Sequence, residues 1–486
     1  MGIVIKQSIS NTVITYIGFA IGAANTLFMY PRILGADFFG LTGFILSSGN
    51  VIMPLMAFGV HNTMVKFFTE YRHDHEKNGF LTYLLLLPLI AAVPILAVCY
   101  FGYDKIAGYF STESPIIFDF FWQIPLIGLC MAYFEIFYAW VKVHLKSVFG
   151  TFAREIFLRI LITAGLFAVY FGWISAAEFI NLTLLIYLLI TIVMAVYAFR
   201  IRKFRFRMQF PVNRKLIFQY SVFIILSGSV ANMLLDLDKM MMGKMLDLDN
   251  IAFYSVAIFI ATVISVPSRA MHQIAYPITA KLMAENKFDE LNDFYKRTSI
   301  SLQIVGGLVF VGILVNVRQI YLLLPPEYSQ GLFTVFTIGF SKYLDLILGN
   351  NNSIIFNSKY YKAVLFLGLL LAFVQIALNL YLIPIMMIDG AALATLISIA
   401  LYSLAKLLFV VFKMKLFPFT KKTLISFAIL AVSFLLFYYW DFDFHPIINI
   451  GIKSAMVAIF FVGSHYWWKV SPEVNSVIDK VLSFIK

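Results

Sequence analysis

Charged side chains inside two long apolar stretches are the residues of this sequence best suited to chemistry. Arg269 lies near the middle of the stretch 251–280, and Lys342 and Asp345 lie within 331–356. An ionised side chain at mid-bilayer costs about 2.5–3.5 kcal/mol on insertion scales, so each one needs a partner, water or a function. Arg offers a planar fork of donors to phosphate oxygens, and Lys a mobile positive charge. The two basic residues therefore predict an anion-binding site, although Asp345, one turn from Lys342, is also placed to neutralise it.

Polar residues recur at helical spacing in four of the stretches, where they would share one face of each helix. These stripes contain Asn11, Thr15, Gly18, Gly22 and Asn25; Asn232, Asp236 and Lys239; Ser265, Arg269, His272, Gln273 and Tyr276; and Thr334, Ser341, Lys342, Asp345, Gly349 and Asn352. Asp238 is predicted to point away from the face that carries Asp236. Two interpretations stay open: the stripes line a polar cavity, or they pack helices through small residues and interhelical hydrogen bonds.

The cavity interpretation gives a candidate binding site. Its members are Arg269, Lys342, Asp345, Asp236, Lys239, Asn25, Asn232, His272, Gln273 and Asn352. Arg269 and Lys342 would hold an anionic group, and the amides would hydrogen-bond polar parts of the same cargo. Asp236, Asp345 and His272 are alternative sites for a coupling proton or sodium ion. The sequence shows no catalytic or metal-ligating constellation, and no cofactor is expected.

The other charged residues of the apolar stretches include four basic residues and Glu135. Arg159, Arg318, Lys406 and Lys453 fall near the predicted helix ends, where a long side chain reaches the interface and needs no partner. We expect structural roles for these four. Glu135 lies deeper, in the inner third of its stretch, and has no evident partner.

About fourteen apolar stretches of near-bilayer length must position these residues. A span needs roughly 20 mostly apolar residues to cross a core of about 30 Å. Only helices and closed barrels satisfy their backbone hydrogen bonds there, and these runs are continuous rather than alternating, which indicates helices. The predicted helices are 9–30, 40–63, 80–102, 116–141, 155–172, 177–199, 216–243, 251–280, 299–323, 331–356, 363–384, 388–412, 423–440 and 447–468. We therefore predict an all-α, polytopic membrane protein of about 14 transmembrane helices.

Composition and charge agree with that class. Hydrophobic residues make up 61% of the chain and charged residues 13%, against about 25% charged in a soluble domain. Of the 37 Lys and Arg residues, 27 lie at the termini or in alternate gaps between stretches, and only 3 lie in the other gaps. The positive-inside rule then places both termini in the cytoplasm. The net charge of +12 is expected to face anionic lipid rather than nucleic acid.

The gaps between the stretches hold little else. Every predicted external gap is short, which leaves no room for an external catalytic domain, so the protein is not expected to be an enzyme. The longest polar segment, 200–215 (RIRKFRFRMQFPVNRK), is predicted to be a basic linker on the cytoplasmic membrane surface. Cys99 and Cys130 both lie in apolar runs and are expected to be core residues without a disulfide.

The two halves of the chain echo each other weakly. The segment 32–40 (RILGADFFG) aligns with 244–252 (KMLDLDNIA) at a constant offset of 212 residues, with a basic residue, Leu and Asp in register. Each segment is predicted to form an external turn that enters an even-numbered helix. Repeated halves are common in transporters, whose substrate site lies between the repeats.

At these residues the chain resembles a known family. The turn 34–40 (LGADFFG) looks like the LG-x-x-x-[FY]-G turn of the Wzx-like O-antigen flippases, bacterial polysaccharide transporters of the multidrug, oligosaccharidyl-lipid and polysaccharide (MOP) exporter superfamily. The run 235–239 (LDLDK), Ala252 to Tyr254 and Pro277 are also similar, although the family more often has Gly where Ala252 stands.

That resemblance implies a fold and an activity. The fold would be two pseudo-symmetric six-helix lobes in a V with two additional C-terminal helices. The predicted domains are 1–199 (first lobe), 200–215 (linker), 216–412 (second lobe) and 413–486 (two helices and a tail). The activity would be export of a polyprenyl-diphosphate-linked oligosaccharide across the bacterial cytoplasmic membrane, by alternating access, for lipopolysaccharide or other surface polysaccharide biosynthesis. The implied partners are that lipid-linked oligosaccharide, membrane lipids and polysaccharide-assembly proteins.

Three alternative functions compete with that one. A multidrug/cation antiporter of the same superfamily would need an acidic cavity, whereas Arg269 and Lys342 favour an anionic cargo. A flippase of lipid-linked peptidoglycan precursor stays open. A membrane polysaccharide polymerase or ligase would use the same kind of substrate but would need a substantial external loop.

Overall fold

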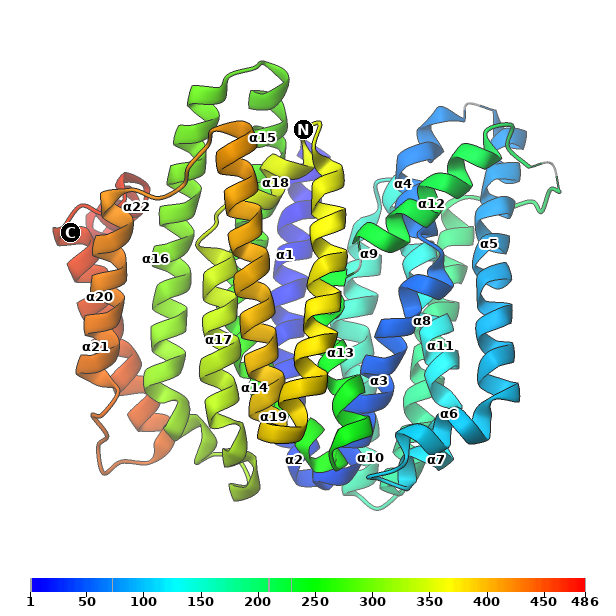
Figure 1. Ribbon diagram of the computed structural model, residues 1–486, viewed down its shortest axis with the longest axis horizontal. Coiled ribbons are helices and arrows are strands. Elements are labelled where there is room, and N and C mark those ends of the chain that lie inside the picture. The colour runs from blue at the N-terminus through cyan, green and yellow to red at the C-terminus, as the bar shows by residue number, and fades with distance from the viewer. Residues whose placement is uncertain (1, 72, 209, 229, 486) are drawn as a thin grey trace. The chain divides into compact units, whose positions relative to one another are not determined.

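The chain is built from helices that form two compact units. The structure is a computed structural model that describes residues 2–71, 73–208, 210–228 and 230–485, and every regular element in these ranges is a helix (Figure 1). Unit 1 spans Met1–Ser255 and unit 2 spans Val256–Lys486. The prediction of an all-α, polytopic membrane protein is confirmed.

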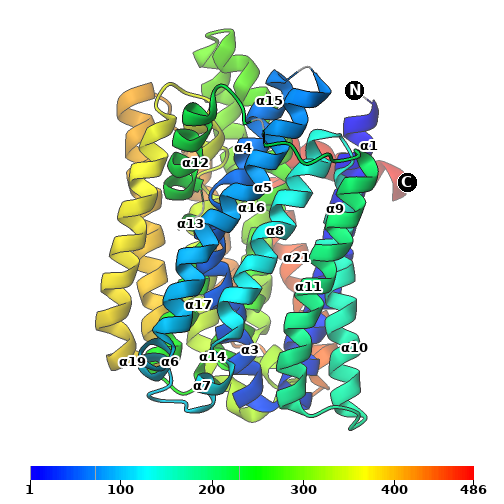
Figure 2. The ribbon, with the colours of Figure 1, turned by 90° about the vertical axis from the view of Figure 1, so that its right-hand side faces the viewer.

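Unit 1 contains most of the short helices. Its elements are α1 (Gly2–Ala23), α2 (Tyr30–Ile33), α3 (Gly35–Ala57), α4 (Val60–Phe67), α5 (Asp74–Phe101), α6 (Tyr103–Phe110), α7 (Ile116–Phe120), α8 (Gln123–Val143), α9 (Ser147–Phe152), α10 (Leu158–Tyr170), α11 (Ala176–Ile201), α12 (Arg214–Gly228) and α13 (Val230–Met245). Two π-helical turns, η1 (Ala24–Met29) and η3 (Ala153–Phe157), join α1 to α2 and α9 to α10. The long helix α8 packs against both α3 and α11 (Figure 2).

Unit 2 contains the longest helices. After α14 (Leu248–Thr262), which crosses the boundary between the units, come α15 (Val266–Ala284), α16 (Phe288–Tyr321), α17 (Leu332–Leu346), α18 (Asn351–Phe356), α19 (Tyr361–Met414), α20 (Lys421–Phe437), α21 (Pro446–Trp467) and α22 (Pro472–Ile485). Helix α16 packs against α15, α17, α20 and α21 and is therefore the central helix of this unit.

Helix α19 is a hairpin of two helices rather than one rod. Its backbone leaves helical geometry at Met387, with φ 52° and ψ −127°, and a β-carbon on Gly390 would collide with the carbonyl oxygen of Leu382. The Gln375 amide donates a hydrogen bond of 2.8 Å to the Thr395 hydroxyl across the hairpin. The two halves correspond to the eleventh and twelfth stretches predicted from the sequence.

Nine helical segments among the described residues are long and apolar enough to cross a membrane. The other predicted stretches fall on helices that are shorter or more polar, such as α17 with 15 residues and α20 with 17. Helices α13, α17 and most of α15 belong to this second group, and they carry most of the predicted site residues. Length and apolarity alone therefore miss the helices with the most chemistry.

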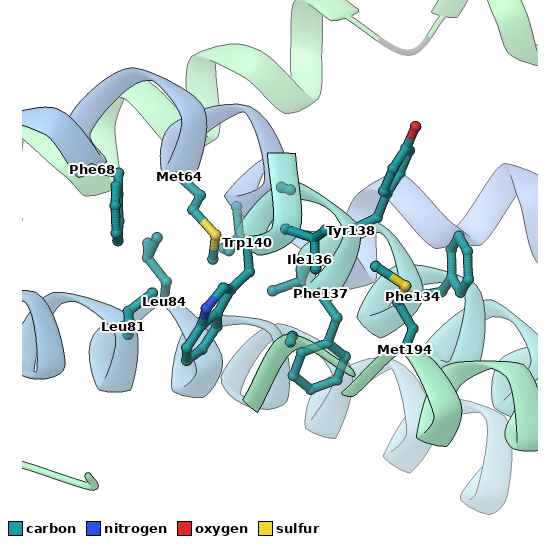
Figure 3. Close-up of a cluster of buried hydrophobic side chains, with 14 of the residues drawn as sticks. Met64, Phe68, Leu81, Leu84, Phe134, Ile136, Phe137, Tyr138, Trp140 and Met194 are labelled. Atoms are coloured by element: carbon teal, nitrogen blue, oxygen red, sulfur yellow. The ribbon is translucent and has the colours of Figure 1, made fainter. Parts of the chain in front are cut away.

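The core of unit 1 fixes α8 against its neighbours. Met64 of α4, Leu84 of α5 and Met194 of α11 surround Trp140 and Ile136 of α8, and all five side chains are buried (Figure 3). Lipid tails are as apolar as these side chains, so close packing rather than exclusion from water holds such helices together. The packing sets the rotation of α8 and hence the direction of Glu135 on it.

The two turns of the internal repeat contact each other. A β-carbon on Gly40 would collide with the carbonyl oxygen of Leu248, and one on Gly243 would collide with the ring of Phe44. Ala252, where the resembled family more often has Gly, is fully buried. Glycine at these two positions lets α3 approach α13 and α14, which brings α13 beside the polar side chains of α3.

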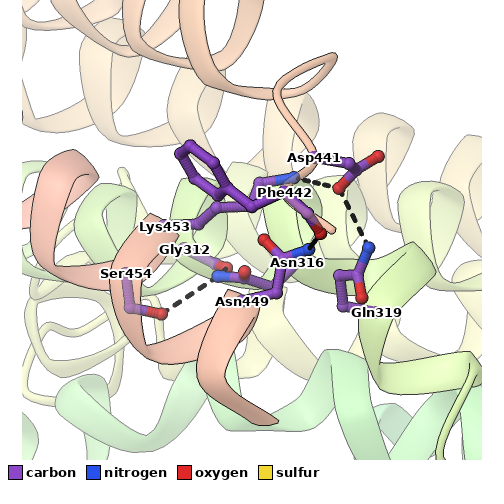
Figure 4. Close-up of polar contacts among 8 residues, drawn as sticks. All are labelled: Gly312, Asn316, Gln319, Asp441, Phe442, Asn449, Lys453 and Ser454. Atoms are coloured by element: carbon purple, nitrogen blue, oxygen red, sulfur yellow. Dashed lines mark hydrogen bonds and ion pairs between the residues drawn. The ribbon is translucent and has the colours of Figure 1, made fainter. Parts of the chain in front are cut away.

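A buried polar network joins α16 to the C-terminal helices (Figure 4). Lys453 of α21 forms an ion pair with Asp441, with Nζ 3.0 Å from Oδ1, and Gln319 of α16 donates 3.0 Å to the same oxygen. The Lys453 side chain is only 2% exposed, so the prediction that it reaches the interface without a partner is wrong. Burial alone would raise the pKa of Asp441, but the hydrogen bonds from Lys453 and Gln319 outweigh it and hold that pKa below its ordinary value.

Candidate functional site

Unit 2 contains a buried ion pair within its polar helices. The Lys406 side chain of α19 is 2% exposed, and its Nζ donates 2.9 Å to Asp345 Oδ1 of α17 and 3.2 Å to Asn352 Oδ1 of α18. The same ammonium group lies 4.3 Å from the centre of the Tyr402 ring. Three helices thus fix one positive charge by a carboxylate, an amide and an aromatic face.

Two further groups complete what we call the Lys406 cluster: Lys406, Asp345, Asn352, Lys342 and His272. Lys342 of α17 and His272 of α15 both lie within electrostatic reach of the Asp345 carboxylate. The Asp345 side chain is 48% exposed, so the cluster opens onto accessible space. With two lysines and one carboxylate, it has an excess of positive charge.

The structure corrects the sequence analysis at this cluster. Lys406 was expected to reach the interface without a partner, and that expectation is wrong, because its ammonium group is buried against Asp345. The ion pair of Asp345 is therefore made with a residue 61 positions later in the chain, while Lys342 stays close by. The spacing of residues in the sequence does not indicate an ion-pair partner at that separation.

Some of the predicted polar residues at and near α15 make local hydrogen bonds, and others are exposed. The Ser265 hydroxyl donates to the Thr262 carbonyl, a purely local bond. Arg269 is exposed and makes no ion pair with any residue of the described ranges, and Tyr276 is half exposed. The side chain of Gln273 lies outside what the structure describes. Arg269 precedes His272 by three residues, so the two share one side of the helix.

Unit 1 contains a second polar group, which we call the Asp236 cluster: Asp236, Lys239, Ser47, Asn50 and Tyr187. Ser47 and Asn50 of α3 donate hydrogen bonds to the Asp236 carboxylate of α13. Lys239 interacts electrostatically with Asp236, and Tyr187 of α11 lies within the same range. The side chain of Asn232 on α13 is outside the described set.

Asp238 faces away from this cluster, as the helical spacing predicts. It is fully buried and accepts a hydrogen bond of 2.6 Å from the Tyr254 hydroxyl of α14. The carboxylate therefore helps to join α13 to α14 and has a structural partner.

A cavity of about 280 Å³ adjoins the Asp236 cluster. Asn50 and Tyr187 line it together with Glu135 of α8 and Arg154 of η3. Glu135 and Arg154 form an ion pair, which gives Glu135 the partner that the sequence did not reveal. The sequence did indicate a possible partner for Glu135, because Arg154 is a basic residue directly before the predicted stretch 155–172. These two residues were missed as members of a site.

The stripe on α1 packs against α10 and η3. A β-carbon on Gly18 would collide with the Glu155 carbonyl oxygen. The Asn25 side chain is buried, donating 3.3 Å to the Arg159 carbonyl and accepting 2.9 Å from the Thr163 hydroxyl. Arg159, expected to be unpaired, forms an ion pair with Glu155 at 2.8 Å, so that expectation is also wrong. The Asn25 side-chain amide thus links η1 to α10.

The two clusters supply charge and hydrogen bonds rather than bond-making chemistry. Fixed ion pairs, amides and a phenol surround accessible space in each unit, a lining suited to a polar or charged cargo. Within the described ranges, no group of three or more His, Cys, Asp or Glu side chains could hold a metal ion.

Comparison with known proteins identifies the fold. No protein family profile and no curated protein matches the sequence. Among solved structures, the chain is similar to a lipid II flippase MurJ in an inward closed conformation, with TM-score 0.75 and 15% identity over 95% of this chain and 99% of that one. It is also similar to an inward-facing MATE multidrug resistance transporter of the MOP superfamily, with TM-score 0.60 and 13% identity over 83% and 94% of the two chains. The outward-facing form of a MATE transporter gives TM-score 0.54 and 12% identity over 84% and 96%. The fold is that of MOP superfamily transporters.

Proposed function

We propose that this protein exports a polyprenyl-diphosphate-linked saccharide across the bacterial cytoplasmic membrane, for surface polysaccharide biosynthesis. The observation that carries the proposal is the excess positive charge of the Lys406 cluster, next to accessible space and inside the apolar part of unit 2. A diphosphate is the anionic part of such a lipid. In a partly dehydrated site, its attraction to lysine is much stronger than in water.

The fold supports a transporter, and the choice of cargo has two candidates. The first is the oligosaccharide carrier implied by the resemblance of residues 34–40 to O-antigen flippases. The second is lipid-linked peptidoglycan precursor, which is favoured by the similarity to the lipid II flippase over 95% of the chain. Both cargoes carry a diphosphate between a polyprenyl chain and a saccharide, so one charge arrangement serves either.

Each part of the site has a proposed task. Lys342 and Arg269 hold the diphosphate, and a charge-assisted contact of this kind contributes about 1.5–3 kcal/mol. Lys406 is tethered by Asp345 and adds to the positive field. Asn352, which accepts a hydrogen bond from Lys406, offers its side-chain amide to a sugar hydroxyl.

A coupling ion is a further part of the proposal. Asp236, Asp345 and His272 are its candidate sites, for a proton or for sodium. Flipping in proteoliposomes should respond to an imposed sodium or proton gradient, and Asp236→Asn or Asp345→Asn should remove that response while leaving some uncoupled flipping. Equal rates with and without either gradient in the unaltered protein would contradict coupling.

Flipping in proteoliposomes tests the main proposal. A fluorescent polyprenyl-diphosphate oligosaccharide and fluorescent lipid II would each be reconstituted with the protein, and exposure of the label to an external quencher would be timed. Arg269→Ala and Lys342→Ala should each slow flipping about tenfold. Arg318→Ala, which removes an exposed basic residue on α16 outside the cluster, is the matched control and should flip normally.

The outcomes separate the candidate functions. If one of the two lipids is flipped faster than the other, the faster one is the cargo. Full activity in the Arg269→Ala, Lys342→Ala double variant would show that the diphosphate is held elsewhere. Proton- or sodium-driven movement of cationic drugs, without flipping of either lipid, would establish the multidrug/cation antiporter instead.

The proposed orientation places both termini in the cytoplasm. Single cysteines placed at Lys105 and Asp441 should react with a membrane-impermeant thiol reagent from outside intact cells, and those at Lys77 and Arg207 should not. Labelling of the Asp441 position only after the cells are opened would reverse the orientation of unit 2.

A further inference from the structure

A large pocket lies at one end of unit 2, apart from the two clusters. It has a volume of about 760 Å³ and is formed where α15 ends, α16 begins, α18 ends and α19 both begins and ends. Figure 1 shows these helix ends at the top of the unit. None of the residues of the Lys406 cluster lines it.

The rim of this pocket is basic. Lys359, Lys413 and Lys415 line it and are all exposed, and none of them forms an ion pair within the described ranges. One carboxylate, that of Asp289, is also part of the lining. By contrast, Lys287 beside the pocket pairs with Glu285 and Glu290. The three rim lysines therefore leave an uncompensated positive charge around a concave surface.

The floor of the pocket is apolar, and its edge is held in place. Met283 and the buried Leu416 also line the pocket, and both belong to one apolar cluster. The backbone of Lys415 adopts a left-handed conformation with φ 57° that ends α19. The next turn is fixed by a hydrogen bond of 3.0 Å from the Phe417 N–H to the Asn292 side chain. Lys413 and Lys415 are thus presented by a defined chain end rather than by a free tail.

We propose that this pocket binds the head group of an anionic phospholipid. A phosphate bound to the lysines would place the glycerol and upper acyl carbons over the apolar floor. Inorganic phosphate would fill only a small part of 760 Å³, whereas pockets of about 300–1,000 Å³ are usual for drug-sized organic molecules. The loops at this end of unit 2 also belong to the basic set that the positive-inside rule assigns to the cytoplasmic leaflet, where anionic lipids are abundant.

Lipid binding to the purified full-length protein tests this proposal independently of transport. Thermal stability and native mass spectrometry would be measured during titration with dihexanoyl-phosphatidylglycerol, dihexanoyl-phosphatidylcholine and inorganic phosphate. Each lysine near an anionic lipid contributes about fivefold in affinity. The triple variant Lys359→Gln, Lys413→Gln, Lys415→Gln should therefore bind phosphatidylglycerol at least tenfold more weakly.

Two further variants separate a pocket from a diffuse charge effect. Lys362→Gln, Lys421→Gln, Lys480→Gln removes three exposed lysines of unit 2 that lie outside the pocket, and it should keep the affinity. Ala284→Trp fills the pocket and leaves its charges in place, and it should weaken binding as the first triple variant does.

Four results would overturn the proposal. These are equal binding of phosphatidylcholine, an equal loss in both triple variants, unchanged affinity in Ala284→Trp, and inorganic phosphate binding as tightly as phosphatidylglycerol. The last result would assign the site to a free phosphate.

Discussion

The Asp236 cluster of unit 1 and the Lys406 cluster of unit 2 are built from the same residue types but differ in charge balance. In unit 1, three basic side chains each face a carboxylate: Arg154 pairs with Glu135, Arg159 pairs with Glu155, and Lys239 lies within electrostatic range of Asp236. In unit 2, two lysines share one carboxylate, and Arg269 lies one helical turn from the cluster.

This difference separates structural charge from charge available to a cargo. Where every basic group faces a carboxylate, an arriving anion gains little attraction and would have to compete with existing pairs. Where lysines outnumber carboxylates, the net positive charge still attracts an anion. Under the proposed function, the positive excess of the Lys406 cluster favours that cluster over the Asp236 cluster as the place that holds the diphosphate.

The largest expected effect is on the buried ion pair of unit 2. Lys406→Met should lower the free energy of unfolding by about 2–3 kcal/mol, because it removes the ion pair between α19 and α17 and leaves Asp345 only the longer-range charges of Lys342 and His272. The figure is at the low end of the range for buried pairs, since the Asp345 side chain is half exposed. Thermal unfolding of purified protein measures it.

The control for that change removes both charges. Lys406→Met, Asp345→Asn should recover most of the lost stability and keep the flipping rate measured without an imposed gradient, because it removes one charge of each sign and leaves the net positive charge of the cluster unchanged. If the single variant is as stable as the unaltered protein, the ion pair does not hold α17 to α19.

A smaller effect is expected from the matching ion pair of unit 1. Glu135→Gln, Arg154→Gln removes both charges from the cavity and should leave flipping within about twofold, with a stability loss near 1 kcal/mol for the changed hydrogen bonds. Flipping assays with the two fluorescent lipids measure it. A tenfold loss of flipping with normal protein abundance would show that the charges of unit 1 are also needed for transport.

Asp236→Asn should have a similar, small effect on stability. The amide keeps the shape of the carboxylate and can still accept hydrogen bonds from Ser47 and Asn50, but Lys239 loses an attracting charge. We expect a loss of about 1 kcal/mol, measured by thermal unfolding. A loss above about 3 kcal/mol would mean that Asp236 is the main counter-charge in unit 1.

The smallest effect concerns pH. The pKa of Asp441 lies below its ordinary value of 3.8, so its pairing with Lys453 stabilises the fold above that value and is lost as the pH falls through the lower folded value. The effect should stay under about 1 kcal/mol, because the carboxylate is partly exposed. Lowering the pH from about 5 to 3 should therefore destabilise the unaltered protein slightly more than Asp441→Asn. Identical pH profiles would assign no role to this pair.

The helical class of the fold was predictable from the sequence because the bilayer imposes length and apolarity on most of the spans. The hairpin of α19 was predicted as two stretches on either side of Met387, and the backbone breaks at that residue. The face of Asp238 followed from helical spacing alone. Both predictions depend on rules that act within one helix.

The pairing of charges was not predictable, because it depends on how neighbouring helices are rotated. Lys406 lies eight residues before the end of α19 and therefore resembles a side chain that reaches the interface. Its burial arises from α17 and α18, which bring Asp345 and Asn352 to it. Glu135 likewise acquired a partner from η3. Helical periodicity fixes a face, but it does not say which helix that face meets.

The hairpin of α19 also has a consequence for biosynthesis. Its two halves are joined at Met387 with almost no loop, and the polar residue of the turn, Asp389, accepts a hydrogen bond from Thr334 of α17. A ribosome-bound chain cannot release the first half into lipid as an independent span without also committing the second, since no aqueous segment separates them. We expect the insertion machinery to receive these 54 residues as one folded hairpin, already held together by Gln375 and Thr395.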